Sequence, residues 1–170
     1  MITIVRLDER LIHGQIGVAW ASRMGTDTVV VVNDKAASNP LSKQTLLAAA
    51  PRNNKTVVKT VDQAIQILND PRCETKKIFV IVGNWDDLYT IATRVPDVTY
   101  LNIGNYGRMA PSNPGLTRQA YSADIFLDEI EIEKVKKIMA LPLRCECQTI
   151  PENPAVPLAD LLTRGIQKKG

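Results

Sequence analysis

The segment R-L-D-E-R-L-I-H-G-Q, residues 6–15, contains the only histidine of the chain, His13. Imidazole commonly serves as a metal ligand, as a general base, or as a nucleophile that carries a group covalently. A metal site needs further ligands at suitable spacing, and no second histidine or cysteine cluster lies near His13. The chain has no G-x-S-x-G nucleophile motif, and the loop has too few glycines for a dinucleotide fingerprint. This leaves a carrier of phosphoryl groups.

The neighbours of His13 suit such a carrier. Gly14 and Gln15 are expected to begin a helix, whose free backbone N–H groups and dipole favour an anion. Arg10 offers a planar fork to phosphate oxygens, and we expect it to close on the phosphorylated ring. Asp8 is expected to accept a hydrogen bond from one ring nitrogen, which fixes the tautomer and leaves the other nitrogen as nucleophile.

The residue types alone leave other interpretations open. A lone histidine before a helix also fits a capping or surface residue without chemistry. Arg6 and Glu9 are better explained as a strand-end charge and an exposed-loop charge than as catalytic groups. A non-catalytic α/β module that binds a nucleotide or another ligand is an alternative, as is a regulatory phosphoprotein.

Short β-branched runs alternate with amphipathic segments along the chain. The strand-like runs are 2–7, 28–33, 55–60, 77–82, 98–103, 123–127 and 143–150. The helix-like segments are 14–24, the stretch that opens with S-N-P-L, 61–69, 86–94, 129–139 and 158–165. This alternation predicts one α/β domain over residues 1–170, an open, mostly parallel sheet of about seven strands with helices on both faces. Ligands of such sheets bind at the carboxyl ends of the strands, where the His13 loop would lie.

The bulk composition is that of a soluble globular protein. Of 170 residues, 45% are apolar and 23% are charged, and the net charge of +3 gives no basic stripe for nucleic acid. No apolar run reaches the length of a membrane span, and the N-terminus does not resemble a signal peptide. We therefore expect a cytoplasmic protein whose Cys73, Cys145 and Cys147 are reduced thiols, with neither a metal nor a cofactor.

The segment R-L-D-E-R-L-I-H-G-Q-I resembles the signature of the IIB components of the mannose–fructose–sorbose family of the bacterial sugar phosphotransferase system. Three further segments resemble family segments in the same order: V-V-V-V-N-D-K-A-A-S-N-P, Y-L-N-I-G and I-F-L-D-E-I-E-I-E-K-V. The resemblance implies that the histidine accepts phosphate from a IIA domain and passes it to a sugar during uptake through the IIC and IID membrane proteins. It also implies peripheral association with that transporter, and leaves a homo-oligomer possible.

By position, the resemblance matches His13 to the phosphorylated residue and Asp8 and Arg10 to the acid and the arginine of its loop. Asn102 and Gly104 match the N-[IV]-G at the end of the fifth strand, and are expected to help bind the phosphate. The chain departs from the family just beyond, where N-Y-G-R-M-A-P-S-N-P-G is several residues longer. We expect this irregular loop to form one wall of a docking surface, with Tyr106 and Arg108 meeting IIA or the sugar.

Overall fold

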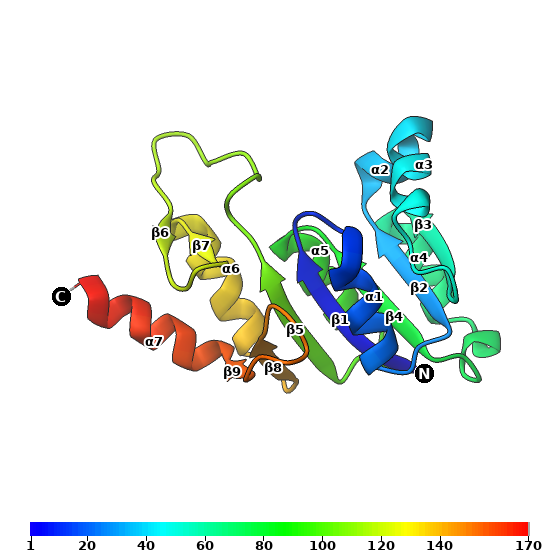
Figure 1. The fold of residues 1–170 in the computed structure, drawn as a ribbon. Helices are drawn as coiled ribbons and strands as arrows, with labels where there is room; N and C mark the ends of the chain where they lie inside the picture. Colours follow the sequence, from blue (N-terminus) through cyan, green and yellow to red (C-terminus); the bar gives the residue numbers. More distant parts are fainter. Residues whose placement is uncertain (170) are drawn as a thin grey trace.

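The computed structural model describes residues 1–169, and its centre is one seven-stranded sheet (Figure 1). The strands of this sheet are β1 (Ile2–Asp8), β2 (Thr28–Val32), β3 (Lys55–Lys59), β4 (Ile78–Val82), β5 (Tyr100–Asn105), β8 (Arg144–Cys147) and β9 (Val156–Pro157). Their order is β3-β2-β4-β1-β5-β8-β9, and only the β8–β9 pair is antiparallel. The mostly parallel sheet predicted from the sequence is confirmed.

Helices cover both faces of this sheet. The main helices are α1 (Gly14–Arg23), α2 (Asp34–Ser38), α3 (Pro40–Ala48), α4 (Val61–Leu68), α5 (Trp85–Arg94), α6 (Glu129–Met139) and α7 (Leu158–Lys169), with a short 3₁₀ turn η1 (Pro71–Cys73). Side chains of α1, α2 and α3 pack in one apolar cluster, and those of α4, α5, α6 and α7 pack in the other. No helix within residues 1–169 is both long and apolar enough to cross a bilayer.

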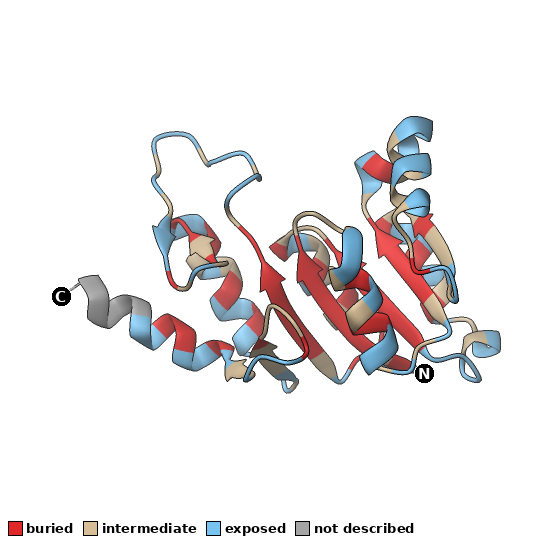
Figure 2. Ribbon diagram, in the orientation of Figure 1, coloured by how far each residue is buried: buried red, intermediate tan, exposed pale blue. Residues whose placement is uncertain are grey.

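The valine run of β2 shows why the sequence forms a central strand. Successive side chains of a strand point to opposite faces, so a strand covered on both sides must be apolar throughout. Val29 and Val31 pack toward α1, while Val30 and Val32 pack toward α4, and all four are almost fully buried. The central strands accordingly form a continuous buried layer (Figure 2).

Side-chain caps fix where several helices begin. Thr60 before α4 and Asp128 before α6 each form a capping box with the residue three positions later. Asn84 caps α5, and Asn39 caps α3 just ahead of a proline at its first turn. The helix after β1 lacks such a cap, because the side chain of its N-cap residue, His13, makes no hydrogen bond to the first turn.

Three details differ from the expectations. The segment 123–127 does not join the main sheet, because only Phe126–Leu127 (β7) is a strand and it pairs with Gln119–Ala120 (β6) in a separate two-stranded ribbon. The seventh strand is instead β9, in the proline-rich segment expected only to lead into the last helix. The five-residue helix α2 was also missed. The strands β6, β7 and β9 are two residues long and α2 is five residues long, so none of them is long enough to leave a periodic pattern in the sequence.

Candidate active site

The loop of residues 9–13 leaves the carboxyl end of β1, which lies between β4 and β5 in the middle of the sheet. The following helix, α1, packs on one face of the sheet, whereas α5, which follows the neighbouring strand β4, packs on the other. Connections that leave adjacent strands toward opposite faces open a crevice at the sheet edge. The His13 loop therefore lies at a topological switch point.

The backbone of this loop holds two residues in the left-handed region. Leu11 has φ of 59° and Gly14 has φ of 47°. Leucine adopts such a conformation only when the surroundings impose it, and such residues cluster at functional sites. The leucine side chain is anchored over Gly83 at the end of β4, where an added Cβ would lie 3.2 Å from Leu11 Cδ2. The loop is thus a fixed turn that presents His13 at the start of α1.

The imidazole of His13 is half-buried and turned toward its own loop. Its Nδ1 lies 3.1 Å from the carbonyl oxygen of Leu11, an atom that can only accept, so the contact is a hydrogen bond when Nδ1 carries the proton. Nε2 then holds the lone pair, and it is buried without a partner among the described residues. The acceptor expected to be Asp8 is in fact the Leu11 carbonyl.

Asp8 instead holds Arg10. The Asp8 carboxylate, 1% exposed, accepts hydrogen bonds from the backbone N, Nε and Nη2 of Arg10 at 3.0, 3.1 and 3.2 Å. A fork of this kind fixes the plane of the guanidinium and leaves its outer edge free. Arg10 remains partly exposed, with a side chain 31% accessible. The two residues predicted for the site therefore form one unit.

Arg6 is not the strand-end charge that the sequence suggested. It is 2% exposed, and its guanidinium donates to Asn102 Oδ1 and to the carbonyl oxygens of Gln148 and Thr149, the latter two at 2.8 and 2.7 Å. It also stacks on Trp20 of α1, 4.6 Å from the ring centre. An arginine inside an otherwise apolar strand was the only sequence signal for this network.

Asn102 and Gly104 serve Arg6 rather than an open phosphate site. Asn102 is fully buried, accepts from Arg6 and donates to the Tyr100 hydroxyl at 3.1 Å. A Cβ at Gly104 would overlap the guanidinium of Arg6. The glycine is thus needed for close approach, so both residues match the motif for a reason other than the one expected.

Glu9 joins the His13 loop to the long loop after β5. Its carboxylate accepts from the backbone N of Arg108, Met109 and Ala110 at 3.0, 3.1 and 2.9 Å. Burial alone would raise the pKa of Glu9, but these backbone donors outweigh burial and lower it. Glu9 is therefore not merely an exposed charge, and the long loop does rise beside the His13 loop, as predicted.

Tyr106 is a buried support of this loop, which corrects its expected place on the surface. Its hydroxyl donates to Glu131 Oε2 at 2.5 Å, and its ring packs edge-on against Trp85. Burial first, and then the Glu131 carboxylate, raise its pKa. Arg118 pairs with the same carboxylate and donates to three loop carbonyls, those of Gly107, Ala110 and Pro111. The loop is consequently held from both sides.

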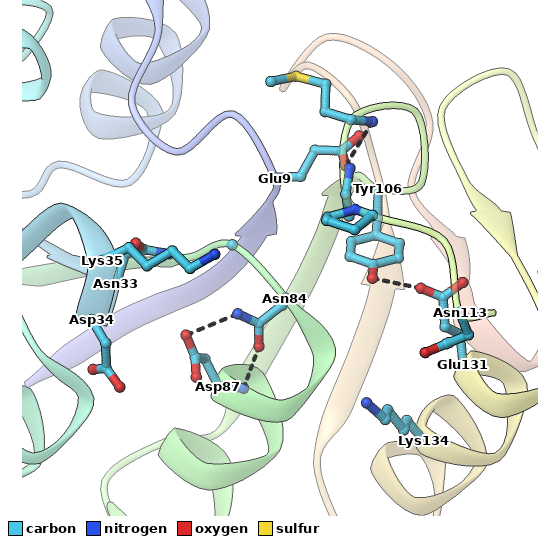
Figure 3. Close-up of a pocket in the computed structure, with 14 residues that line it drawn as sticks. Glu9, Asn33, Asp34, Lys35, Asn84, Asp87, Tyr106, Asn113, Glu131 and Lys134 are labelled. Atoms are coloured by element: carbon cyan, nitrogen blue, oxygen red, sulfur yellow. Dashed lines mark hydrogen bonds between the residues drawn. The ribbon is translucent and has the colours of Figure 1, made fainter. Parts of the chain in front are cut away.

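A polar cleft of about 570 Å³ opens between the two loops and the ends of β2 and β4 (Figure 3). Lys35 from α2 and Asp87 from α5 line it, together with Glu9 and Met109. Burial raises the pKa of Asp87 to about 6, against the opposing hydrogen bond from Asn84, and Asp34 adds to the rise. Arg108 of the long loop is exposed and does not line the cleft; its guanidinium lies 5.3 Å from the Phe126 ring and donates to the carbonyl oxygen of Ala123.

Metal and thiol chemistry find no support in the described residues. Within residues 1–169 no three His, Cys, Asp or Glu side chains are placed to hold a metal ion. The three cysteines are free thiols. Burial raises the pKa of both Cys145 and Cys147 to about 12, so neither thiol is a nucleophile near neutral pH.

The family model of the sorbose-subfamily IIB component of the phosphotransferase system matches residues 2–169. The chain belongs to that family. It is 37% identical to a probable phosphotransferase enzyme IIB component of Streptococcus pyogenes serotype M6, over 95% of this chain and 99% of the relative. It is 24% identical to the sorbose-specific EIIB component of Klebsiella pneumoniae, over 94% and 93%. This IIB component is therefore a phosphotransferase that takes part in sugar uptake.

Solved structures show the same fold. The crystal structure of the IIBSor domain of the sorbose permease from Klebsiella pneumoniae superposes with a TM-score of 0.85 at 23% identity, covering 96% of each chain. The crystal structure of manxB from Thermoanaerobacter tengcongensis gives a TM-score of 0.83 at 25% identity, covering 96% of this chain and 95% of that one. The α/β architecture of this IIB component is thus that of its family.

The contact between Gly104 and Arg6 yields a stability prediction. Gly104→Ala should lower the free energy of unfolding by roughly 1–3 kcal/mol, because the methyl group must displace a guanidinium held by three acceptors. Gly17→Ala in α1 is the matched control. Its Cβ would meet only Ile12 Cγ2 at 3.7 Å, and alanine in a helix should add about 0.5–1 kcal/mol. Urea unfolding gives the free energy of unfolding of both variants. An equal change in Gly104→Ala and Gly17→Ala would contradict the prediction.

The Glu9 clamp yields a prediction on loop order. Glu9→Ala should speed amide hydrogen exchange at Arg108, Met109 and Ala110 by roughly tenfold or more, since their acceptor is gone. Exchange of Val80 in the central strand should not change. Glu9→Gln keeps an acceptor oxygen without the charge, so the exchange rates of the three loop amides in this variant should lie between those of the wild type and of Glu9→Ala. Unaltered exchange of the three loop amides in Glu9→Ala would show that the loop is ordered by other contacts.

Proposed function

We propose that His13 is the residue of this IIB component that accepts a phosphoryl group from a phosphorylated IIA domain or protein and passes it to a sugar. The observation that carries the proposal is the position of His13. The only imidazole of the chain stands as the N-cap of an α1 that no side chain caps, next to the Asp8–Arg10 unit. Phosphoryl transfer depends on positioning and charge neutralisation, which this arrangement supplies without a metal.

Each neighbour has a proposed role in that transfer. The backbone N–H groups of Gly14 and Gln15 are proposed to bind the phosphoryl oxygens at the start of α1, where the first turn contains no acidic residue. Arg10 presents the free edge of its guanidinium to the phosphoryl oxygens, while Asp8 keeps the other edge aligned. A relay must also release its cargo, and one arginine with helix-end amides avoids overstabilising the phosphorylated state.

The imidazole must turn before it can react. One ring nitrogen is bonded to Leu11 and the other is covered, so a donor reaches neither in the resting conformation. We propose that docking of the phosphorylated partner accompanies this rotation, which breaks one hydrogen bond to a carbonyl.

The partners are proposed from the family. The mannose-specific EIIAB component of Escherichia coli is 25% identical over 164 residues, and this chain covers 49% of its length. The name EIIAB combines a IIA and a IIB component, which supports a IIA domain or protein as the phosphate donor. The IIC and IID membrane components are the proposed site of sugar transfer, and we propose that this chain acts in the cytoplasm at the membrane face. Relatives are named for sorbose, mannose and N-acetylgalactosamine, so we propose that the membrane components choose the sugar.

The rim of the long loop is the proposed docking wall. Arg108 and Met109 are exposed there, with Met109 67% accessible, and Glu9 ties both to the His13 loop. Arginine is among the residues that carry binding energy at interfaces. Asn102 and Gly104 contribute to phosphate handling only indirectly, through Arg6.

Replacement of His13 tests the central claim. With phosphoenolpyruvate, the general phosphotransfer proteins and IIA, the wild-type chain should acquire acid-labile phosphate, and His13→Ala should acquire none. A folded His13→Ala protein that still becomes labelled would overturn the proposal. The alternative of a non-catalytic ligand-binding module predicts no label on the wild type either.

Replacement of Arg10 tests charge neutralisation. Arg10→Ala should slow transfer from phospho-IIA by about 10²-fold or more, as removal of a preorganised donor does in other enzymes. Arg72→Ala is a matched control, because Arg72 grips Asp70 with the same two-residue spacing and through the same atoms. The Asp70–Arg72 pair lies at the start of η1, which precedes β4 and so is at the amino-terminal end of that strand. Equal rates in the two variants would remove Arg10 from the mechanism.

A further inference from the structure

Arg6 is a cation placed beneath the reactive loop. It lies two residues before Asp8 on β1, and both side chains are about 2% exposed. Its three hydrogen-bond acceptors are neutral: Asn102 Oδ1 and the carbonyl oxygens of Gln148 and Thr149. The anion nearest to its guanidinium is Asp8, with Nη2 3.9 Å from Oδ2. Arg6 and Asp8 therefore form an ion pair without a direct hydrogen bond.

Asp8 is thus shared by two arginines. Arg10 grips its carboxylate from the solvent side and Arg6 lies on the buried side. A buried carboxylate that loses its only cation is strongly destabilised. Burial lowers the pKa of Arg6 to about 10, with Asp8 opposing the decrease, and the guanidinium therefore stays charged near neutral pH. Asp124 and Tyr100 are the other groups whose charge would favour this cation.

We propose that Arg6 is a positioning residue of the phosphoryl relay, acting through Asp8 on Arg10. As a second cation beside Asp8, it stabilises the buried carboxylate while Arg10, still aligned by Asp8, directs its charge toward the phosphoryl group. The inference rests on the proposed role of Arg10. It assigns a function to the buried network that holds Arg6, in which Gly104 provides space and Asn102 provides an acceptor.

A purely structural role is the competing explanation. Arg6 links β1 to β5 and to the segment after β8, so its loss would weaken the fold in any case. The two explanations differ in how Arg6 and Arg10 combine. A residue that acts through Arg10 has nothing left to position once Arg10 is gone, whereas a structural residue affects transfer independently.

A double-mutant cycle separates the two. The variants are Arg6→Met, Arg10→Ala and both together, and the readout is the single-turnover rate of transfer from phospho-IIA. Arg6→Met should be slower by roughly tenfold. The double variant should match Arg10→Ala within about twofold, since coupled residues are not additive. Rates that multiply would overturn the role of Arg6 while leaving that of Arg10 intact. A normal rate in Arg10→Ala would overturn both.

Two further variants control for the fold. Leu68→Ala removes a buried apolar side chain of α4, outside the network that holds Arg6, so it should lower the unfolding midpoint and leave the transfer rate unchanged. Arg6→Lys keeps the charge without the fork, and should transfer within about threefold of wild type even if it is less stable. If Arg6→Met does not fold, the transfer rate of Arg6→Lys provides the test of the inference. A folded Arg6→Lys as slow as Arg10→Ala would overturn the inference.

Discussion

A guanidinium without water is the constraint on which the carboxyl edge of this sheet depends. Arg6 loses its hydration in the middle of β1, so the surrounding chain must supply acceptors and an aromatic face. Asn102 of β5, the carbonyls after β8 and Trp20 of α1 meet that need. One buried cation thereby joins β1 to β5, to the segment after β8 and to the helix α1 that follows His13.

Much of the fold follows from patterns within short segments. The valines of β2 and the apolar run of β4 are dictated by burial on both faces, and these strands lie within a residue or two of where the sequence predicts them. Helix α6 begins at the Asp128 capping box and spans 129–139, as predicted. The position of the His13 loop at the carboxyl edge of the sheet was also predicted from the sequence, because the first strand ends just before it.

The remaining parts depend on contacts that no local pattern contains. Glu9 binds amides about 100 residues away, and nothing near it in the sequence marks a clamp. Arg6 looks like a strand-end charge until the carbonyls of Gln148 and Thr149 are brought to it. Asn102 and Gly104 were assigned to phosphate because they match the family motif, whereas in the fold their neighbour is Arg6.

The attachment of the long loop to Glu9 bears on the speed of partner exchange. A relay component meets one partner to be charged and another to be discharged, so each turnover includes two encounters. Surfaces that must first order themselves associate slowly and lose conformational entropy in doing so. Here the amides of Arg108, Met109 and Ala110 are held before any partner arrives. In the proposed docking role, this segment is therefore a preformed surface, and association is limited by diffusion and orientation rather than by folding of the loop.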